Sequence, residues 1–215
     1  MEIFDKHFFI YKMSYSDVNI FYADCSSIDI ELAEKSVSKE RLKKAEKLKR
    51  AEDKKLSLGV ELFLSYAIKE LYNIDHKTLE YATCENGKPY FKNLPDVHFS
   101  LSHSGKIAMC AISSLPVGCD CEMSHRKSEG IEKKYFNQME RDLLKNGKTF
   151  AHIWTRKEAV AKCNGRGVAA GLKKIDTTCD FLTFDGAKYR LITVPCALAG
   201  YDMAVCVSAE LPDSR

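Results

Sequence analysis

Two long helical blocks, each followed by strand-like segments, dominate the pattern of this chain. The first block runs from about Ile30 to Tyr72 and the second from about Ile131 to Cys163. The sequence does not alternate single strands with single helices, which is the pattern that predicts a doubly wound parallel sheet. We therefore predict an α+β fold. Two subdomains meeting near Pro116 are compatible with this pattern, although periodicity alone does not establish them.

The predicted strands are short, and both helical blocks contain interruptions. The first block is expected to hold two helices broken near Glu52–Lys55, and the second to be interrupted near Asn146-Gly147. Gly59 lies within the first block, where glycine costs about 1 kcal/mol relative to alanine, so it predicts close packing or a ligand's approach. Strands are expected at residues 18–24, 97–101, 106–113, 117–123, 181–184, 189–194 and 203–210.

Membrane and secreted classes are disfavoured by the sequence. Residues 1–16 mix charges with aromatics and do not resemble a signal peptide. No apolar run approaches the roughly 18 residues that span a bilayer. The nine cysteines form no Cys-x-x-Cys pair, which argues against a disulfide framework and a zinc ribbon. We expect a cytoplasmic protein with structural thiols and no membrane partner.

The positive charge is concentrated in one segment. The net charge of +3 is too small to predict a nucleic-acid binder, and the basic residues lack interleaved aromatics. Between Lys35 and Lys55, however, the sequence has ten Lys and Arg residues and only four Asp and Glu residues. Such a segment is either a solvated helix face or a site for an anion or an acidic partner.

Two carboxylates share one face of the predicted strand 117–123. Side chains alternate along a strand, so Asp120 and Glu122 lie on one face and Cys119 and Cys121 on the other. The cysteine face suits a core. The two acids are about 7 Å apart, two strand rises, and must be solvated, paired or metal-bound. A solvated strand face is the commoner explanation for such a pair.

Two further segments carry candidate chemistry. Trp154, Glu158 and Lys162 are four residues apart and share a helical face, which in isolation indicates only a Glu–Lys pair. Gly165 is expected to end that helix. The Ser102-His-Ser-Gly105 segment is either an anion-binding turn or an ordinary turn. A Ser–His nucleophile pair is disfavoured, because neighbouring strand side chains point to opposite faces.

Taken in order, these segments resemble the signature of the 4′-phosphopantetheinyl transferases. The match is closest to the larger, surfactin-synthetase-activating class, in which one chain holds two similar halves. The resemblance implies two similar α/β subdomains, 1–116 and 117–215, related by a pseudo-twofold axis, with antiparallel-rich sheets and the active site at their interface. It also implies a monomer. The matching segments are Gly87-Lys88-Pro89, Phe99-Ser-Leu-Ser-His-Ser-Gly105, Val117-Gly-Cys-Asp-Cys-Glu122, Trp154-Thr-Arg-Lys-Glu-Ala159 and Lys162-x-x-Gly165-x-Gly167.

The resemblance implies a reaction and a set of site residues. A chain of this family transfers 4′-phosphopantetheine from coenzyme A to a serine of an apo-acyl or apo-peptidyl carrier protein and releases 3′,5′-ADP. The C-terminal subdomain would bind magnesium, and the N-terminal subdomain would contact the phosphates of coenzyme A. Implied magnesium ligands are Asp120, Glu122 and Glu158; implied phosphate contacts are Lys162, Lys88, Ser102 and His103; implied 3′-phosphate contacts are Arg41, Lys44 and Lys55.

The general base and the alternatives stay open at this stage. Glu158, directly or through a water molecule, is our candidate for the group that accepts the serine proton. Lys55 stands where arginine is common in the family, and Glu140 in the segment 136–140 either matches a family segment or only begins a helix. The alternatives are a magnesium-dependent phosphohydrolase of nucleotides or coenzyme A, and a non-catalytic module that binds coenzyme A or a carrier.

Overall fold

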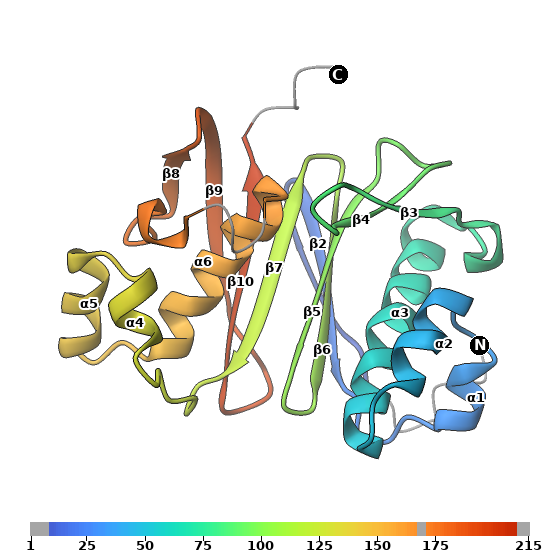
Figure 1. Cartoon of the computed structure of the whole chain (residues 1–215). Coiled ribbons are helices and arrows are strands. Elements are labelled where there is room, and N and C mark those ends of the chain that lie inside the picture. The colour runs from blue at the N-terminus through green and yellow to red at the C-terminus, as the bar shows by residue number, and fades with distance from the viewer. Residues whose placement is uncertain (1–8, 167–170, 210–215) are drawn as a thin grey trace.

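The computed structural model describes residues 9–166 and 171–209, and it contains strands and helices in similar proportion (Figure 1). The strands are β1 (Tyr11–Tyr15), β2 (Val18–Asp24), β3 (Tyr81–Thr83), β4 (Pro89–Phe91), β5 (His98–Ser104), β6 (Ile107–Ser113), β7 (Val117–Met123), β8 (Phe181–Phe184), β9 (Ala187–Val194) and β10 (Tyr201–Ser208). The α-helices are α1 (Ile30–Glu34), α2 (Lys39–Glu46), α3 (Ala51–Tyr72), α4 (Ile131–Tyr135), α5 (Gln138–Lys145) and α6 (Phe150–Asn164).

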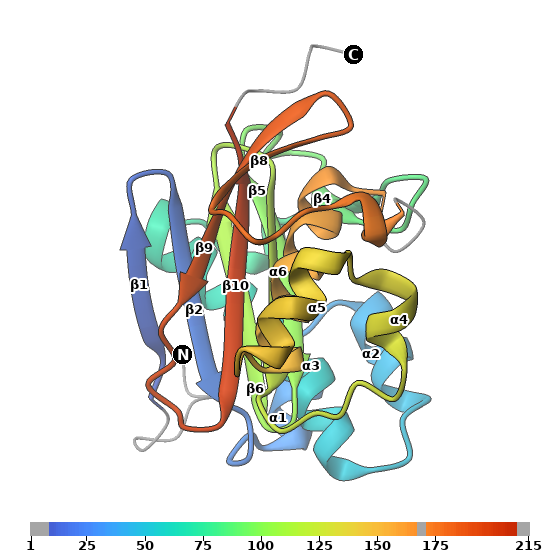
Figure 2. The same cartoon turned by 90° about the vertical axis from the view of Figure 1, so that its left-hand side faces the viewer.

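Two four-stranded antiparallel sheets form the centre of the molecule. Their strand orders are β1-β2-β6-β5 and β7-β10-β9-β8, and β3 and β4 form a separate two-stranded sheet. Helices α1 to α3 lie outside the first sheet and α4 to α6 outside the second (Figures 1 and 2). Each half supplies a strand, a long helix and an antiparallel pair, with the matching orders β2-β6-β5 and β7-β10-β9. The predicted α+β fold with two similar halves is confirmed, whereas the boundary at 116/117 stays a prediction.

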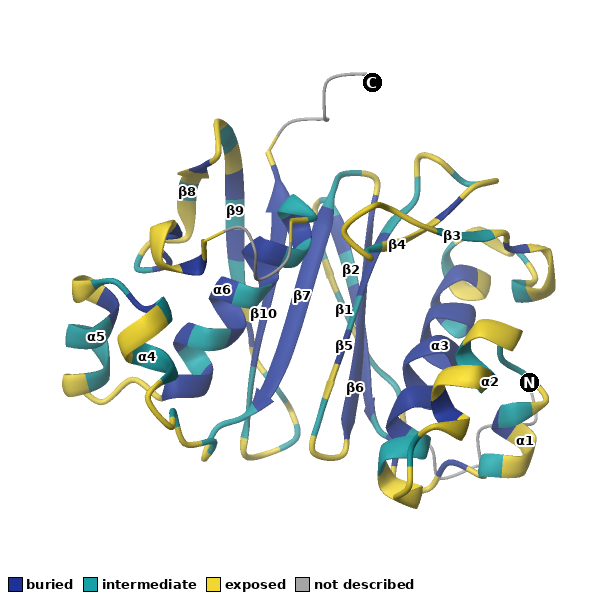
Figure 3. Cartoon of the chain, viewed as in Figure 1, coloured by how far each residue is buried: buried dark blue, intermediate teal, exposed yellow. Residues whose placement is uncertain are grey.

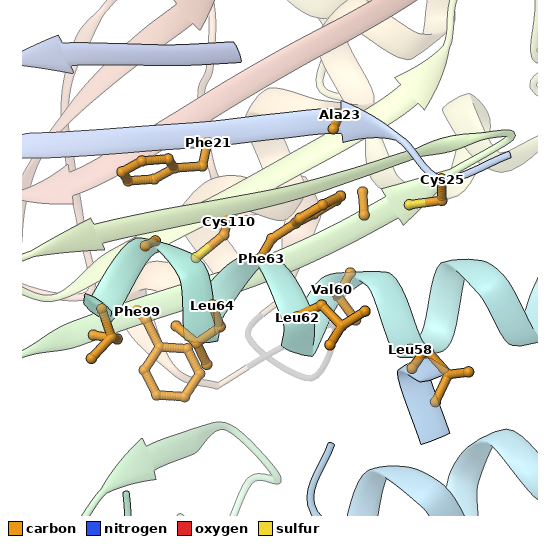
Figure 4. Close-up of a cluster of buried hydrophobic side chains, with 14 of the residues drawn as sticks. Phe21, Ala23, Cys25, Leu58, Val60, Leu62, Phe63, Leu64, Phe99 and Cys110 are labelled. Carbon is orange, nitrogen blue, oxygen red and sulfur yellow. The ribbon is translucent and has the colours of Figure 1, made fainter. Parts of the chain in front are cut away.

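The apolar side chains of the first sheet alternate between two cores. Phe21 and Cys110 belong to the same core cluster as Phe63 of α3, and Figure 4 shows the Phe63 side chain pointing from that helix toward the strands. Their neighbours Ile20 and Met109 face the second sheet. Strands with both faces buried are thus sandwiched between a helix layer and another sheet, as the dark central strands of Figure 3 show.

The core between the two sheets belongs to both halves. Val18, Ile20 and Met109 from the first half pack in one cluster with Cys119 and Val205 from the second. All five are fully buried. Burying a side chain of this size contributes roughly 1.5–3 kcal/mol, so neither half keeps its full core when the other is removed.

Several predicted boundaries need correction. The first helical block holds three helices and not two, with breaks at residues 35–38 and 47–50. No break lies near Glu52–Lys55, because α3 begins at Ala51 with Glu52 and Asp53 in its first turn. Acidic side chains in a first turn interact favourably with the helix dipole, so they start this helix instead of ending one. Strand β5 continues through Ser104 into the predicted turn, and β1, β3 and β4 were not predicted. The predicted strand 203–210 ends at Ser208, and Glu210 lies outside the described residues.

Two further expectations, the interruption of the second helical block and close packing at Gly59, are confirmed. The second helical block is interrupted between Lys145 and Phe150. Gly59 permits close packing, since a Cβ atom there would lie 2.7 Å from Cys25 Sγ. All nine cysteines are free thiols, and six of them are buried. In the described part of the chain, no helix has both the length and the apolar character needed to cross a bilayer.

Candidate active site

Helix α6 lies directly on β7 because position 118 has no side chain. A Cβ atom on Gly118 would lie 2.0 Å from Ala159 O and 2.4 Å from Cys163 N, so any larger residue would push the helix away. The predicted faces of β7 are confirmed: Cys119 and Cys121 enter the core between the sheets, and the acids lie on the opposite face. Contact at Gly118 therefore brings the helix to the acid-bearing face.

Three serines of β5 join the edge of the first sheet to β7. Ser100 Oγ accepts a hydrogen bond from Cys119 N at 3.0 Å. Ser102 Oγ accepts a hydrogen bond from Cys121 N at 3.3 Å and donates one to Asp120 Oδ1 at 2.7 Å. Ser104 Oγ donates to Glu122 Oε1. The contacts advance together along both strands, so β5 and β7 run in the same direction. We call this contact the serine seam.

Asp120 is paired with both a serine and a lysine. Its side chain is nearly buried and receives the Lys162 ammonium at 2.7 Å in addition to the Ser102 hydroxyl. The same ammonium donates to Cys119 O at 3.0 Å. Burial alone would lower the pKa of Lys162, but the charges of Asp120 and Glu158 and the Cys119 thiol outweigh it and raise that pKa. Lys162 is therefore held as a cation beside Asp120.

Glu158 is the acid with fewest partners. It is half-buried on α6, and among the described residues no hydrogen bond or ion pair involves its carboxylate. Burial, followed by repulsion from Asp120, raises the pKa of Glu158, while Lys162 and Arg126 oppose that shift. A carboxylate with raised proton affinity and a free oxygen is suited to accept a proton. The partial exposure of Trp154, Glu158 and Lys162 confirms that they share one helix face.

Glu122 is turned toward a basic side chain. Its carboxylate accepts hydrogen bonds from Ser104 Oγ and, at 3.0 Å, from Met123 N. It also forms an ion pair with the guanidinium of Arg126. That guanidinium lies 5.7 Å from the centre of a Trp154 ring. Glu122 is thus neutralised by the protein itself.

The chemistry of these acids suits a hard cation. Magnesium prefers carboxylate oxygens, water and substrate phosphates. Asp120 and Glu158 are close enough to affect each other's charge, and Glu122 extends from the same face of β7 as Asp120. In the described part of the chain, no three His, Cys, Asp or Glu side chains are clustered closely enough to hold a metal ion. For Glu122 to join Asp120 and Glu158 as a metal ligand, its carboxylate would have to exchange the Arg126 guanidinium for the metal ion.

A basic cleft of about 1020 Å³ opens beside the serine seam. Four of the predicted phosphate contacts line it, namely Arg41, Lys44, Lys55 and His103. Residues that sequence reasoning missed complete it: Arg50 and Lys106 add positive charge, and Met123 and Tyr201 come from the second half. The cleft is therefore built by both halves, although all of its charged side chains come from the first.

The basic side chains of the cleft differ in how firmly they are held. Arg41 Nε lies 3.2 Å from the buried carboxylate of Glu61. Lys55 donates to the backbone carbonyl of Ser26. Lys44 is exposed and makes no side-chain hydrogen bond or ion pair with another described residue. Of the three predicted 3′-phosphate contacts, Lys44 thus has the greatest freedom to contact a ligand.

His103 connects the cleft with the acids. The His103 side chain is exposed to the cleft, but desolvation by the surrounding protein lowers the pKa of His103, and the nearby charges of Lys162 and Arg41 lower it further. The imidazole is therefore inclined to be neutral, which leaves one ring nitrogen as a donor and the other as an acceptor. Its role as a phosphate contact stays a prediction.

Two predicted phosphate contacts are engaged by the protein. Lys88 reaches across to the second half, where its ammonium donates to Val117 O at 2.9 Å and Cys163 O at 3.4 Å. Burial lowers the pKa of Lys88. It also lines a smaller pocket of about 240 Å³ together with Lys162. Ser102 donates to Asp120, so the structure places its hydroxyl in the serine seam and not in the lining of the basic cleft.

Sequence reasoning missed the role of Lys157, the residue before Glu158. Its ammonium is fully buried and lies 2.8 Å from the equally buried carboxylate of Glu140. It also donates to Leu172 O at 2.7 Å. Glu140 completes a capping box with Asn137 in the first turn of α5, one of the two alternatives left open by the sequence, and through Lys157 it also anchors α5 to α6. The sequence signal that could have shown this is the position of Lys157 on the helix, where the residues around it are suited to a core. Gly167 of the predicted motif lies outside the described residues.

Comparison with known proteins gives the class to which this fold and site belong. Residues 24–115 match the family model "4′-phosphopantetheinyl transferase, N-terminal", and residues 116–206 match "4′-phosphopantetheinyl transferase superfamily". The chain is 32% identical over 187 residues to 4′-phosphopantetheinyl transferase Sfp of Bacillus subtilis (strain 168), covering 80% of this chain and 82% of that protein. It is also 32% identical to a 4′-phosphopantetheinyl transferase of Bacillus pumilus, covering 82% and 81%.

A relative that matches a shorter part of the chain is also named a 4′-phosphopantetheinyl transferase. The 4′-phosphopantetheinyl transferase gsp of Aneurinibacillus migulanus is 30% identical over 139 residues, covering 62% of this chain and 58% of that protein. The chain belongs to the 4′-phosphopantetheinyl transferase superfamily, among its Sfp-like members. It is accordingly an enzyme, a transferase of phosphopantetheine.

Proposed function

We propose that this enzyme transfers 4′-phosphopantetheine from coenzyme A to a serine of an apo-carrier protein and releases 3′,5′-ADP, with magnesium at Asp120, Glu122 and Glu158. One observation carries the proposal. A basic cleft of about 1020 Å³, close to the upper end of the usual range for small-molecule sites, is lined by His103, which lies near Asp120, and by Met123, the chain neighbour of Glu122. A polyanionic ligand in the cleft would place a phosphate near the acids, and a hard cation would join the two.

The residues of the chain have distinct tasks in this proposal. Arg41, Lys44 and Lys55 bind the 3′-phosphate, while Lys162, already a cation, faces the pyrophosphate. Glu158 accepts the proton as the serine oxygen bonds to phosphorus and the bond from phosphorus to 3′,5′-ADP breaks. Magnesium, when bound, would supply positive charge for the leaving 3′,5′-ADP.

Intact-protein mass spectrometry tests this function directly. Apo-acyl and apo-peptidyl carriers incubated with the enzyme, coenzyme A and magnesium should each be examined for the mass of one phosphopantetheine group. We expect the gain with magnesium and its loss with excess EDTA. Release of 3′,5′-ADP without any carrier would instead indicate a phosphohydrolase, and full transfer in EDTA would exclude the magnesium site.

The variant Asp120→Ala supplies a second arm. It removes the acid that holds Lys162 and should abolish transfer, because neither the cation nor the metal site would be kept in place. A circular dichroism spectrum equal to that of the wild type is needed to show that the fold persists. The monomeric state and the cytoplasmic location stay predictions.

A further inference from the structure

Arg126 occupies an unusual position beside one acid of the site. It follows β7 in a turn closed by a hydrogen bond from Arg126 N to Met123 O at 2.9 Å. This turn directs the guanidinium back to the Glu122 carboxylate. The guanidinium also lies 5.8 Å from the ring centre of Phe150 and 5.7 Å from that of Trp154. One cation therefore contacts an acid of β7 and an aromatic face of α6.

The exposure of the two partners differs. The Glu122 side chain is 11% exposed, whereas that of Arg126 is 36% exposed. A carboxylate this buried needs a compensating charge or hydrogen bonds. The guanidinium, by contrast, can return to water without moving the backbone. The ring contacts are at the outer limit for a cation–π interaction, so the ion pair with Glu122 is the main contact that holds it in place.

We propose that Arg126 is a positioning residue that neutralises Glu122 in the metal-free enzyme and is displaced from it when a divalent cation binds. The inference rests on the proposed magnesium site. A cation at the Glu122 oxygens would repel a guanidinium bound to the same carboxylate. Once released from Glu122, Arg126 would also leave Trp154. The ring of Trp154 in the Trp-x-x-Lys-Glu-Ala segment would then lose its neighbouring cation and keep its packing on Phe150.

The chain offers its own reporter for this exchange. Trp154 is its only tryptophan, so its emission records the departure of Arg126 without a label. Magnesium should be titrated at constant ionic strength into the wild type and into Arg126→Gln, Arg126→Lys and Lys127→Gln, with emission and calorimetric affinity measured in parallel. Lys127 is the exposed neighbour and controls for the loss of one positive charge.

The expected results separate competition from a purely structural role. Arg126→Gln should bind magnesium about two- to fivefold more tightly, the factor that corresponds to a partly exposed ion pair, and should lose the change in Trp154 emission. Arg126→Lys should keep near wild-type affinity, because it still competes, but with a smaller emission change. Lys127→Gln should behave as the wild type.

Three outcomes would overturn the inference. Equal magnesium affinity in the wild type and Arg126→Gln, or weaker binding in the variant, would show that Arg126 does not compete. Persistence of the emission change in Arg126→Gln would show that it does not report on this residue. Absence of calorimetric binding in all four proteins would mean that the proposed magnesium site is itself wrong, and the inference would fall with it.

Discussion

Lys157 and Glu158 are adjacent in one motif but differ in burial and in how their charges are used. The lysine is completely buried and its charge is used inside the protein, where it pairs with Glu140. The glutamate next to it turns to the open side of α6 and keeps a free carboxylate. Sequence spacing predicted the shared face of Glu158 and Lys162, because the helical period fixes it. It could not reveal the partner of Lys157, which lies on another helix.

Glu158→Gln tests the two tasks given to this residue. The amide keeps the shape of the side chain but cannot accept a proton at neutral pH. We expect coenzyme A to bind within a few-fold of the wild type and transfer to slow by at least ~100-fold. Single-turnover rates at increasing magnesium separate the tasks: a rescued rate indicates lost ligation, and an unrescued rate indicates lost proton transfer. Glu31→Gln on exposed α1 is the control, and near-normal transfer by Glu158→Gln would remove both tasks from this residue.

Lys44→Gln tests the proposed 3′-phosphate contact. Lys44 has no partner among the described residues, so its replacement leaves no other side chain stranded. A charge-assisted phosphate contact is worth roughly 1.5–3 kcal/mol, so the dissociation constant for coenzyme A should rise about tenfold or more. Dephospho-coenzyme A should be little affected.

Its neighbour provides the matched control for that measurement. Lys43 is exposed on the same helix but does not line the cleft. Lys43→Gln should leave both affinities unchanged in isothermal titration calorimetry. Equal weakening of coenzyme A by both variants would show that general charge, and not a specific contact, attracts the ligand.

At the scale of elements, the position of α6 on β7 depends on a single glycine. Gly118→Ala would place a methyl group 2.0 Å from the backbone oxygen of Ala159. We expect a loss of unfolding free energy of about 3 kcal/mol or more, since backbone atoms yield less easily than side chains. Transfer should also fall, because Glu158 and Lys162 would move away from Asp120.

Gly59→Ala is the comparison for this prediction. There the new methyl would meet the side-chain ends of Cys25 and Ile28, at 2.7 and 2.9 Å, which can shift. Alanine also favours the helix by about 1 kcal/mol. Urea denaturation should therefore show a clearly smaller loss than for Gly118→Ala. Similar losses at both positions would contradict the argument from backbone contact.

At the scale of the whole molecule, the two halves share one core and are expected to unfold together. Val18 and Met109 of the first half pack with Cys119 and Val205 of the second. Unfolding should therefore be a single transition. Trp154 emission reports on the second half, and helical circular dichroism is dominated by α3 of the first and α6 of the second. Their urea midpoints should coincide, and two separated midpoints would show that the halves are independent.

The fold was more predictable from sequence than the site. Helix and strand periods reveal most elements, and the alternation in strand 117–123 gave the faces of Asp120 and Cys119 correctly. The edge strand β1 was missed because its burial is only partial. The site was harder, because Lys88 and Ser102 contact residues that are distant in sequence, and no local pattern shows that these polar groups bind the protein itself.

The serine seam has a consequence for how this site can change over generations. In an ordinary sheet the backbone sets the alignment of neighbouring strands, so it survives almost any substitution. Here β5 and β7 are aligned by the hydroxyls of Ser100, Ser102 and Ser104, each specified by one codon. Point mutations at these three positions would therefore change the contacts that hold the acids beside the basic cleft without removing a backbone hydrogen bond of either sheet. Selection can therefore act on the alignment of β5 and β7 through single substitutions at these serines.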